Sequence, residues 1–472
     1  MQYQGISGMT YSLHDEKLAS GGEGTIYEIT GNDKQVAKIF KPERRSRERE
    51  EKLCVMVQKP LTEMQLRQIA WPQDVLYDQT GFVGYIMPKV ENTEPLVSLY
   101  SDSRYQLRDR LLAAINLCAV MDTVHEMGQV CGDLNPQNIC INVDTEDRQN
   151  GLQIMLVDAD SYHFVTPGKI YRCEVGLAEY LAPEIQRKLT ADIDLKNASL
   201  PTYTQETDLF ALAVHIFELL MNGCHPFACA KDTAVYQSDI AQTTESTSQN
   251  SIVAPQPIDN IKNGFFPFYE KRPGITHPIY APAFESLPER IRQLFIQVFV
   301  EGNRDPSRRI PAETWKNELW AYRNQFVRCE KGHEYFAHNA VCPICAIEER
   351  AQNFLAGLAG MVDSSDMPKK VEPKPVGTTN PRQVGYGKGP TTVSGGGSGT
   401  GGYGQSWKSF ETKKKNTSMN ISDIIGCIAG CIVGFILIIM IVLRLYQGID
   451  SVYSQHTTRY NNEISSEQSS EE

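Results

Sequence analysis

The stretch that decides the fold is CGDLNPQN at residues 131–138, which is followed by VDAD at residues 157–160. The first segment places Asp133 and Asn138 five residues apart in a loop after a helical pattern, and the second puts Asp158 at the end of a strand-like run. An aspartate near an attacking hydroxyl, with an amide and a carboxylate on Mg²⁺, is what phosphoryl transfer needs. The two segments therefore predict one site for that chemistry.

A glycine-rich turn lies upstream, in LASGGEGTIYEI at residues 18–29, with Gly21, Gly22 and Gly24 between two strand-like runs. Glycine lets the backbone approach phosphates closely and turn its N–H groups toward them. Lys38 follows on the next strand-like run, where its ammonium can neutralise phosphates as a point charge. Such turns and lysines are common by themselves, so the prediction of a phosphate site rests on their combination with the two acidic segments.

The apolar pattern along the chain is strand-rich at first and helical afterwards. KQVAKIF at residues 34–40 and VGYIMPKV at residues 83–90 are typical of strands. Apolar residues recur with helical period over residues 106–127. Residues 208–221 form a nearly wholly apolar helix, which we expect deep in a core.

In order and spacing these motifs resemble those of the protein kinase superfamily, and within it the eukaryotic-like (Hanks-type) Ser/Thr kinases of bacteria. The resemblance extends over about residues 11–322. It implies an α+β, bilobal protein-kinase-like fold. The N-lobe is expected at residues 11–90 and the C-lobe at residues 91–322, with a polar insertion at residues 229–260.

The resemblance also implies a role for each motif residue. Asp133 orients the acceptor hydroxyl and Lys38 holds the phosphates, whereas Asn138 and Asp158 hold Mg²⁺. The implied cofactors are ATP and Mg²⁺. The residues expected around them are Ala19, Gly21, Gly22, Gly24, Ile26, Lys38, Pro88, Val90, Asn138 and Asp158.

In the family Lys38 is paired with a glutamate of a helix, and RRSREREEKLCVM at residues 44–56 supplies several. We favour Glu51, because the apolar residues that follow it can pack this helix inward. Glu48 and Glu50 remain open alternatives.

Two further matches concern the C-lobe. GLAEYLAPE at residues 176–184 resembles the end of an activation segment, and Glu184 would pair with Arg309. Asp208 matches the aspartate that braces the catalytic-loop backbone in the family.

The sequence also departs from the family pattern. The departures are Ala19 for the first loop glycine, Cys131-Gly132 for His-Arg, Asn135 for a lysine, Asp158-Ala159-Asp160 for Asp-Phe-Gly, and Leu177 for a threonine. Without the arginine, a phosphate on the activation segment lacks its usual partner. We hypothesise that activity is not switched there by phosphorylation. A pseudokinase that acts as a nucleotide-binding scaffold is the alternative function.

A metal site is predicted beyond the C-lobe, in a small module at residues 326–348. CEKGHEYFAHNAVCPIC contains two short ligand pairs, Cys329 with His333 and Cys342 with Cys345. Two such pairs, each on its own turn, can close a tetrahedron around a structural Zn²⁺. The alternatives to a metal site are a disulfide or free thiols. Within a metal site, His338 is an alternative ligand.

The rest of the chain predicts a membrane anchor. Residues 362–419 are rich in Gly, Pro, Ser and Lys and predict a flexible, disordered linker. Residues 424–443 are twenty uncharged residues, enough for one transmembrane helix. A short acidic tail, residues 444–472, follows.

The charges flanking this segment predict its orientation. Three lysines at residues 413–415 precede it, which favours a cytoplasmic kinase-like domain, a single pass through the cell membrane and a C-terminal tail outside. Gly426, Gly430 and Gly434 are spaced by four, so they can form a homodimer contact. Glycine is common in transmembrane helices, so the homodimer contact stays a hypothesis.

Composition limits the partners. The net charge is −11, which argues against nucleic acid as the main partner. The twelve cysteines are scattered apart from the metal cluster, which suits a reducing compartment. The resemblance implies a protein kinase that phosphorylates Ser or Thr hydroxyls of a protein substrate, and the apolar segment 424–443 predicts that it is anchored in a membrane.

Overall fold

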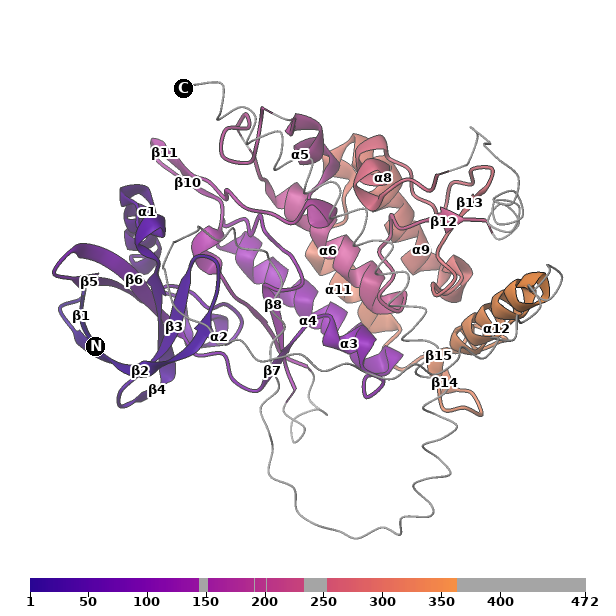
Figure 1. Cartoon of the computed structure of the whole chain (residues 1–472), viewed down its shortest axis with the longest axis horizontal. Coiled ribbons are helices and arrows are strands. Elements are labelled where there is room, and N and C mark those ends of the chain that lie inside the picture. The colour runs from indigo at the N-terminus through magenta and orange to yellow at the C-terminus, as the bar shows by residue number, and fades with distance from the viewer. Residues whose placement is uncertain (144–151, 191, 201, 233–252, 363–472) are drawn as a thin grey trace, which may run out of the picture. The chain divides into compact units, whose positions relative to one another are not determined.

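The computed structural model describes residues 1–143, 152–190, 192–200, 202–232 and 253–362. A closed barrel of six strands forms the N-terminal part, and a mainly helical lobe follows it (Figure 1). The barrel strands are β1 (Gln2–Gly5), β2 (Thr10–Ser20), β3 (Gly24–Ile29), β4 (Asn32–Phe40), β5 (Asp74–Asp78) and β6 (Gly81–Pro88). Their order around the barrel is β1-β2-β3-β4-β6-β5.

The barrel has two faces because side chains alternate along each strand. On β4, Ala37 and Ile39 point into the barrel and join its own small core. Val36 and Phe40 point the other way and belong to the large core shared with the helical lobe. Lys38 lies between them in the sequence, so it shares the face that turns toward that lobe.

The N-lobe begins earlier than the predicted boundary at residue 11. Strand β1 pairs with both β2 and β5, and this pairing closes the barrel. Two helices cross from β4 to β5, α1 (Arg47–Val57) and the single turn α2 (Glu63–Leu66). Ser46 caps α1, since its side chain accepts a hydrogen bond from the Arg49 backbone N–H.

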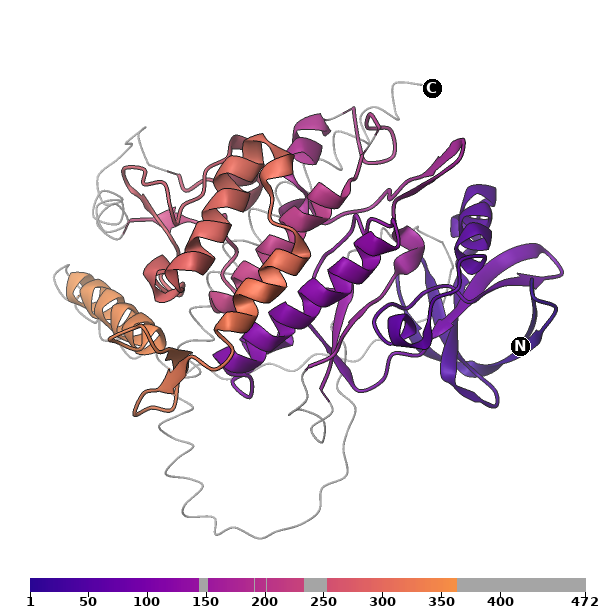
Figure 2. The ribbon, with the colours of Figure 1, turned by 180° about the vertical axis from the view of Figure 1, so that it is seen from behind.

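Helices dominate the second lobe, and Figure 2 shows α4, α6 and α11 running beside one another. The helices are α3 (Ser98–Ser101), α4 (Leu107–Glu126), α5 (Pro183–Lys188), α6 (Gln205–Leu220), α8 (Pro257–Asn263), α9 (Glu289–Ile296), α10 (Gly302–Arg304) and α11 (Ala312–Ala321). Every residue of α6 from Thr207 onward is buried, as its apolar sequence predicts for a helix inside a core.

Short sheets complete the lobe. Strands β7 (Thr93–Pro95), β8 (Ile139–Asn142) and β9 (Ile154–Leu156) form one sheet, while β10 (Phe164–Thr166) pairs with β11 (Lys169–Tyr171) and β12 (Ala230–Lys231) with β13 (Ile275–Thr276). The catalytic loop, residues 131–138 with Asp133 and Asn138, precedes β8, and Asp158 follows β9. Because these two strands pair, the two segments that decide the fold lie side by side.

The last described part is a hairpin followed by a helix. Strand β14 (Phe326–Arg328) pairs with β15 (Glu334–Phe336), and α12 (Pro343–Val362) follows. Helix α12 begins within the module predicted at 326–348 and continues past residue 348.

Several predictions fall outside the described residues. These are most of the insertion (233–252), the linker beyond residue 362, the segment 424–443 with Gly426, Gly430 and Gly434, and the tail 444–472. None of the helices in the described ranges is long and apolar enough to cross a membrane.

Candidate active site

A row of side chains crosses four strands of the barrel on the face toward the helical lobe. In register, Ala19 of β2 is opposite Ile26 of β3, Ile26 is opposite Lys38 of β4, and Lys38 is opposite Tyr85 of β6. Residues directly opposite one another on neighbouring strands project to the same face. The register therefore brings Ala19, Ile26 and Lys38, three residues predicted around ATP, into one row.

Lys38 sits between two carboxylates. Its Nζ donates to Asp158 Oδ1 and to Asp160 Oδ1, each at 2.9 Å, and Asp160 Oδ1 also accepts from the Tyr85 hydroxyl at 2.7 Å. Burial alone lowers the pKa of Lys38, but the charges of Asp160 and Asp158 outweigh it and raise this pKa above its ordinary value. Lys38 is therefore a fixed cation at neutral pH.

The predicted pair between Lys38 and Glu51 is not formed, so this prediction is corrected. Glu51 faces Arg47 and Lys169 instead, and it forms an ion pair with each. The other two candidate glutamates do not replace it, since Glu50 accepts a hydrogen bond from the Tyr77 hydroxyl and Glu48 is exposed. The cause is the orientation of α1, which turns Lys52, Leu53 and Met56 inward.

Asp158 has an unusual backbone. Its φ and ψ are 57° and 37°, in the left-handed region that non-glycine residues seldom adopt. Such backbone strain is found where the surrounding structure fixes a functional side chain. Here it turns the carboxylate toward Lys38, while half of the Asp158 side chain stays exposed, enough to reach a metal ion.

Asp208 holds the catalytic loop in place, as the resemblance implied. Its carboxylate accepts hydrogen bonds from the backbone N–H groups of Cys131 and Gly132, at 2.8 and 2.9 Å. Gly132 has a φ of +75°, and a Cβ there would lie 2.9 Å from the Cys173 sulfur. A glycine is therefore required at this position, where the family usually carries arginine.

Asp133 is oriented by the two amides of its loop. Asn135 Nδ2 donates to one carboxylate oxygen of Asp133 at 2.8 Å, and Asn138 Nδ2 donates to the other at 3.2 Å. Burial raises the pKa of Asp133 above its ordinary value, and the hydrogen bonds from both amides oppose that rise. Asn135 thus serves Asp133, whereas the lysine it replaces would serve the phosphate.

The glycines of the loop have different reasons to be glycine. A Cβ on Gly24 would lie 2.5 Å from the Ile39 carbonyl oxygen, so the close approach of β3 to β4 requires this glycine. A Cβ on Gly21 would meet open space, which leaves that position free for a ligand. At the loop tip Glu23 forms a bidentate ion pair with Arg49 of α1, whose guanidinium lies 4.6 Å from the Phe40 ring centroid.

The segment after β6 is where the resemblance expects adenine, at the Pro88 carbonyl and the Val90 N–H. Pro88 is the last residue of β6 and lies opposite Gln35 of β4. Lys89 donates its backbone N–H to the Lys34 carbonyl at 2.8 Å. Pro88 and Val90 are both partly exposed, as a contact with a ligand requires.

The activation segment is held by contacts with the helical lobe and with α1. Glu184 forms the predicted pair with Arg309, with its two oxygens 2.7 and 2.6 Å from the guanidinium. On the other side, Lys52 of α1 donates to the Arg172 carbonyl at 3.3 Å. Burial lowers the pKa of Lys52 to about 8.

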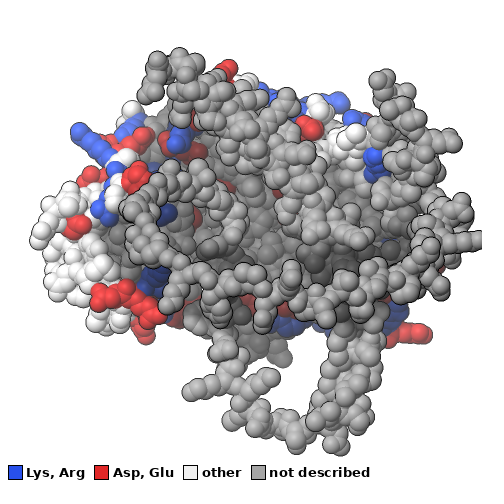
Figure 3. Space-filling model, in the orientation of Figure 1, with Lys and Arg blue, Asp and Glu red and all other residues white. Residues whose placement is uncertain are grey.

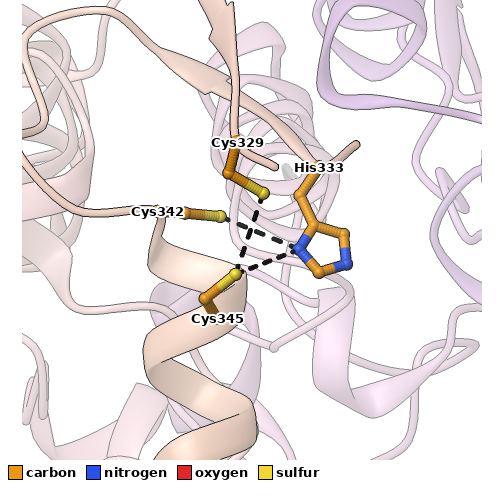
Figure 4. A group of neighbouring side chains, drawn as sticks. All are labelled: Cys329, His333, Cys342 and Cys345. Carbon is orange, nitrogen blue, oxygen red and sulfur yellow. Dashed lines mark hydrogen bonds between the residues drawn. The ribbon is translucent and has the colours of Figure 1, made fainter. Parts of the chain in front are cut away.

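Four predicted metal ligands converge at the end of the described chain (Figure 4). Cys329 Sγ lies 3.8 Å from Cys345 Sγ, and His333 Nδ1 lies 3.8 Å from Cys342 Sγ and 3.4 Å from Cys345 Sγ. Tetrahedral Zn²⁺ with bonds of about 2.3 Å to sulfur places two sulfurs about 3.8 Å apart. The donor set and its spacing therefore fit Zn²⁺.

The surroundings of this cluster also suit a metal. His333 turns Nδ1 toward the sulfurs, and its Nε2 lies 3.7 Å from a carboxylate oxygen of Glu348. Metal-bound histidines usually donate their other ring N–H to a carboxylate, a backbone carbonyl or water. His338 points elsewhere, to the Glu285 carbonyl at 3.4 Å.

The module at residues 326–348 is joined to the helical lobe. Glu334 of β15 is almost fully buried, accepts a hydrogen bond from the backbone N–H of Arg108 on α4, and forms an ion pair with the Arg108 guanidinium. Phe336 belongs to the large core, and Arg350 of α12 donates to the Ala281 carbonyl at 2.8 Å.

Comparison with known proteins agrees with this architecture. The family model described as protein kinase domain matches residues 13–321, so the chain belongs to the protein kinase family. Over 350 residues it is 29% identical to "Protein kinase YegI" of Escherichia coli K12, covering 71% of this chain and 48% of that protein. A calcium-dependent protein kinase of Arabidopsis thaliana, number 34, is 22% identical over 187 residues, 39% of this chain and 32% of the relative. The chain spans about half the length of the first of these relatives.

Proposed function

We propose that the chain is an active, ATP-dependent protein kinase that transfers the γ-phosphate of ATP to Ser or Thr hydroxyls of a protein. The observation that supports this best is the presence of two hydrogen-bonded pairs, Lys38 with Asp158 and Asn138 with Asp133. Together they keep every group that phosphoryl transfer needs. A pseudokinase commonly lacks one of them.

Each residue has a chemical task. Asp158 and Asn138 offer carboxylate and amide oxygens, the hard ligands that Mg²⁺ prefers. Bound Mg²⁺ supplies charge neutralisation on the phosphates, and Lys38 adds a fixed positive charge. Asp133, which Asn135 and Asn138 hold, accepts a hydrogen bond from the acceptor hydroxyl and directs it in line with the γ-phosphate.

The activity and the acceptor class are tested together. The purified full chain is incubated with Mg-ATP and casein, and the phosphorylated residues are mapped by mass spectrometry. We expect phosphoserine and phosphothreonine, and we expect neither from Asp158→Asn, which serves as the matched control. Exclusive phosphotyrosine would contradict the acceptor class. ATP binding without transfer to casein or to the chain itself would favour the scaffold alternative.

We also propose that the module around Cys329 holds one structural Zn²⁺. Its support is the fit of the four donor atoms to a tetrahedron. Elemental analysis of the purified chain should find one zinc per molecule, and Cys342→Ser should remove most of it, whereas the matched control Cys140→Ser should keep it. A chain without zinc that still folds would contradict the proposal.

Membrane attachment is a third proposal, and it is supported by the uncharged residues 424–443 and the preceding lysines. The full chain should sediment with membranes and be released by detergent but not by high salt. A version that ends before residue 420 should not sediment. Equal distribution of both versions would refute the anchor.

A further inference from the structure

We propose that Asp160 is the residue that holds Lys38 in position for ATP, in the role that the kinase resemblance gave to a glutamate of α1. Asp160 is a positioning residue, since it acts through Lys38. The inference deepens the proposed function and rests on it.

The two carboxylates on Lys38 differ in burial, and this difference separates their tasks. Both oxygens lie 2.9 Å from Lys38 Nζ, but the Asp158 side chain is 50% exposed and the Asp160 side chain 2%. Asp158 is therefore accessible to a metal ion. Asp160 is closed off from solvent, and its bound oxygen is shared between Lys38 and the Tyr85 hydroxyl.

The positive charges on α1 give a reason for a buried acid beside Lys38. Its inward face carries Arg49, which is partly buried, and Lys52, which is buried, so two cations approach the region around Lys38. Like charges at close range repel one another strongly inside a protein. Arg49 forms its ion pair with Glu23 and Lys52 donates to the Arg172 carbonyl, so Asp160 is the buried acid that pairs with Lys38.

The place of Asp160 in the chain agrees with this assignment. Asp160 lies in the turn Ala159–Ser161, shortly after β9. Because its segment follows β9 and not α1, the position of Lys38 does not depend on a charge from α1.

The test measures Lys38 directly, without relying on catalysis. The full chain is acetylated with trace acetic anhydride at a series of pH values, and the modification of Lys38 is read by peptide mass spectrometry relative to the exposed Lys59. In Asp160→Asn the rise of Lys38 labelling should move to lower pH by at least about one pH unit, which is about tenfold at a fixed pH. The KM for ATP should rise about tenfold or more.

Two other variants give the comparison. Glu51→Gln should leave the Lys38 labelling profile where it is in the wild type. Asp158→Asn should move it less than Asp160→Asn, because solvent screens the exposed carboxylate. A profile that moves in Glu51→Gln and stays in Asp160→Asn would overturn the inference. If Asp160→Asn moves the profile but no version of the chain binds ATP, the pairing of Lys38 with Asp160 stands. The proposed function, and with it the role of Asp160 in ATP binding, would then fail.

A thermal-unfolding cycle covers the case in which Asp160→Asn folds poorly. Loss of one member of a buried pair leaves the other charge unpaired, whereas loss of both is far less damaging. The double variant Lys38→Met/Asp160→Asn should therefore melt higher than Asp160→Asn alone. Lys38→Met/Glu51→Gln should show additive losses. Additive losses in the first pair would contradict the pairing.

Discussion

At the scale of single residues, the departures from the kinase pattern have local physical reasons. Asn135 replaces a lysine and forms a hydrogen bond with Asp133, and its carbonyl oxygen accepts from the Gln137 backbone N–H. Gly132 replaces an arginine because its backbone is left-handed and Cys173 fills the space beside it. These changes alter how the catalytic loop is supported, and they leave its acidic and amide groups in place.

Asn135→Ala tests this support. A hydrogen bond to a charged group contributes about 1.5–3 kcal/mol, so kcat should fall about tenfold or more while the KM for ATP changes little. The exposed Gln137 takes part only through its backbone, and Gln137→Ala is the matched control with wild-type kinetics. Steady-state kinetics on casein measure both variants. An unchanged kcat in Asn135→Ala would show that Asp133 does not need this amide.

At the scale of elements, α1 does not supply the expected glutamate to Lys38 and contacts two other segments instead. It holds the activation segment through Lys52 and Arg172, and through Glu51 and Lys169, and it holds the glycine-rich loop through Arg49. The segment is thus fastened by unmodified side chains. This arrangement supports the hypothesis that its order does not depend on phosphorylation.

Lys52→Met tests how the buried Lys52 of α1 affects the free energy of unfolding. The folded-state pKa of Lys52, about 8, lies below its unfolded value, so the unfolded chain binds more protons between about pH 8 and 10. The free energy of unfolding should therefore rise with pH in that window, by at most about 1.4 kcal/mol for each pH unit. Thermal unfolding should show this rise in the wild type and its loss in Lys52→Met.

The matched control for this experiment is Lys59→Met, since Lys59 is exposed just beyond α1. It should follow the wild type across the whole range. If Lys52→Met and Lys59→Met had the same pH dependence, burial of Lys52 would not be the cause.

The sequence predicted strands β4 and β6, helices α4 and α6, and the closeness of Asp133, Asn138 and Asp158. Strands and helices were recognised by their periodicity, and Asp133, Asn138 and Asp158 by spacing in contiguous motifs. The partner of Lys38 could not be found in this way, because it depends on the rotation of α1 about its axis. Three neighbouring glutamates gave no signal for that rotation, and the two inward-facing cations were not distinguishable from surface residues. Tyr85 was missed because only strand register places it beside Lys38.

At the scale of the whole molecule, the module at residues 326–348 is an integral part of the helical lobe. Glu334 is buried against Arg108, and Phe336 lies in the large core, so folding of the module and of the lobe are coupled. Figure 3 shows that basic and acidic side chains lie interspersed on the described surface of the face that it draws.

Metal removal tests the coupling. A zinc chelator in excess should lower the melting temperature of the whole cooperative transition by several degrees, because binding energy of a structural metal is folding energy. Glu334→Gln should lose part of the same stability without losing zinc. Two separate transitions, with only the smaller one sensitive to the chelator, would show that the module folds on its own.

We propose above that the site built on Lys38 and Asp158 transfers phosphate. This is measured by the intact mass of the full chain after incubation with Mg-ATP, beside Lys38→Met and Asp158→Asn prepared in the same way. We expect added phosphoryl groups on the wild type alone. Equal phosphate on all three proteins, or none on the chain and none on casein, would contradict it.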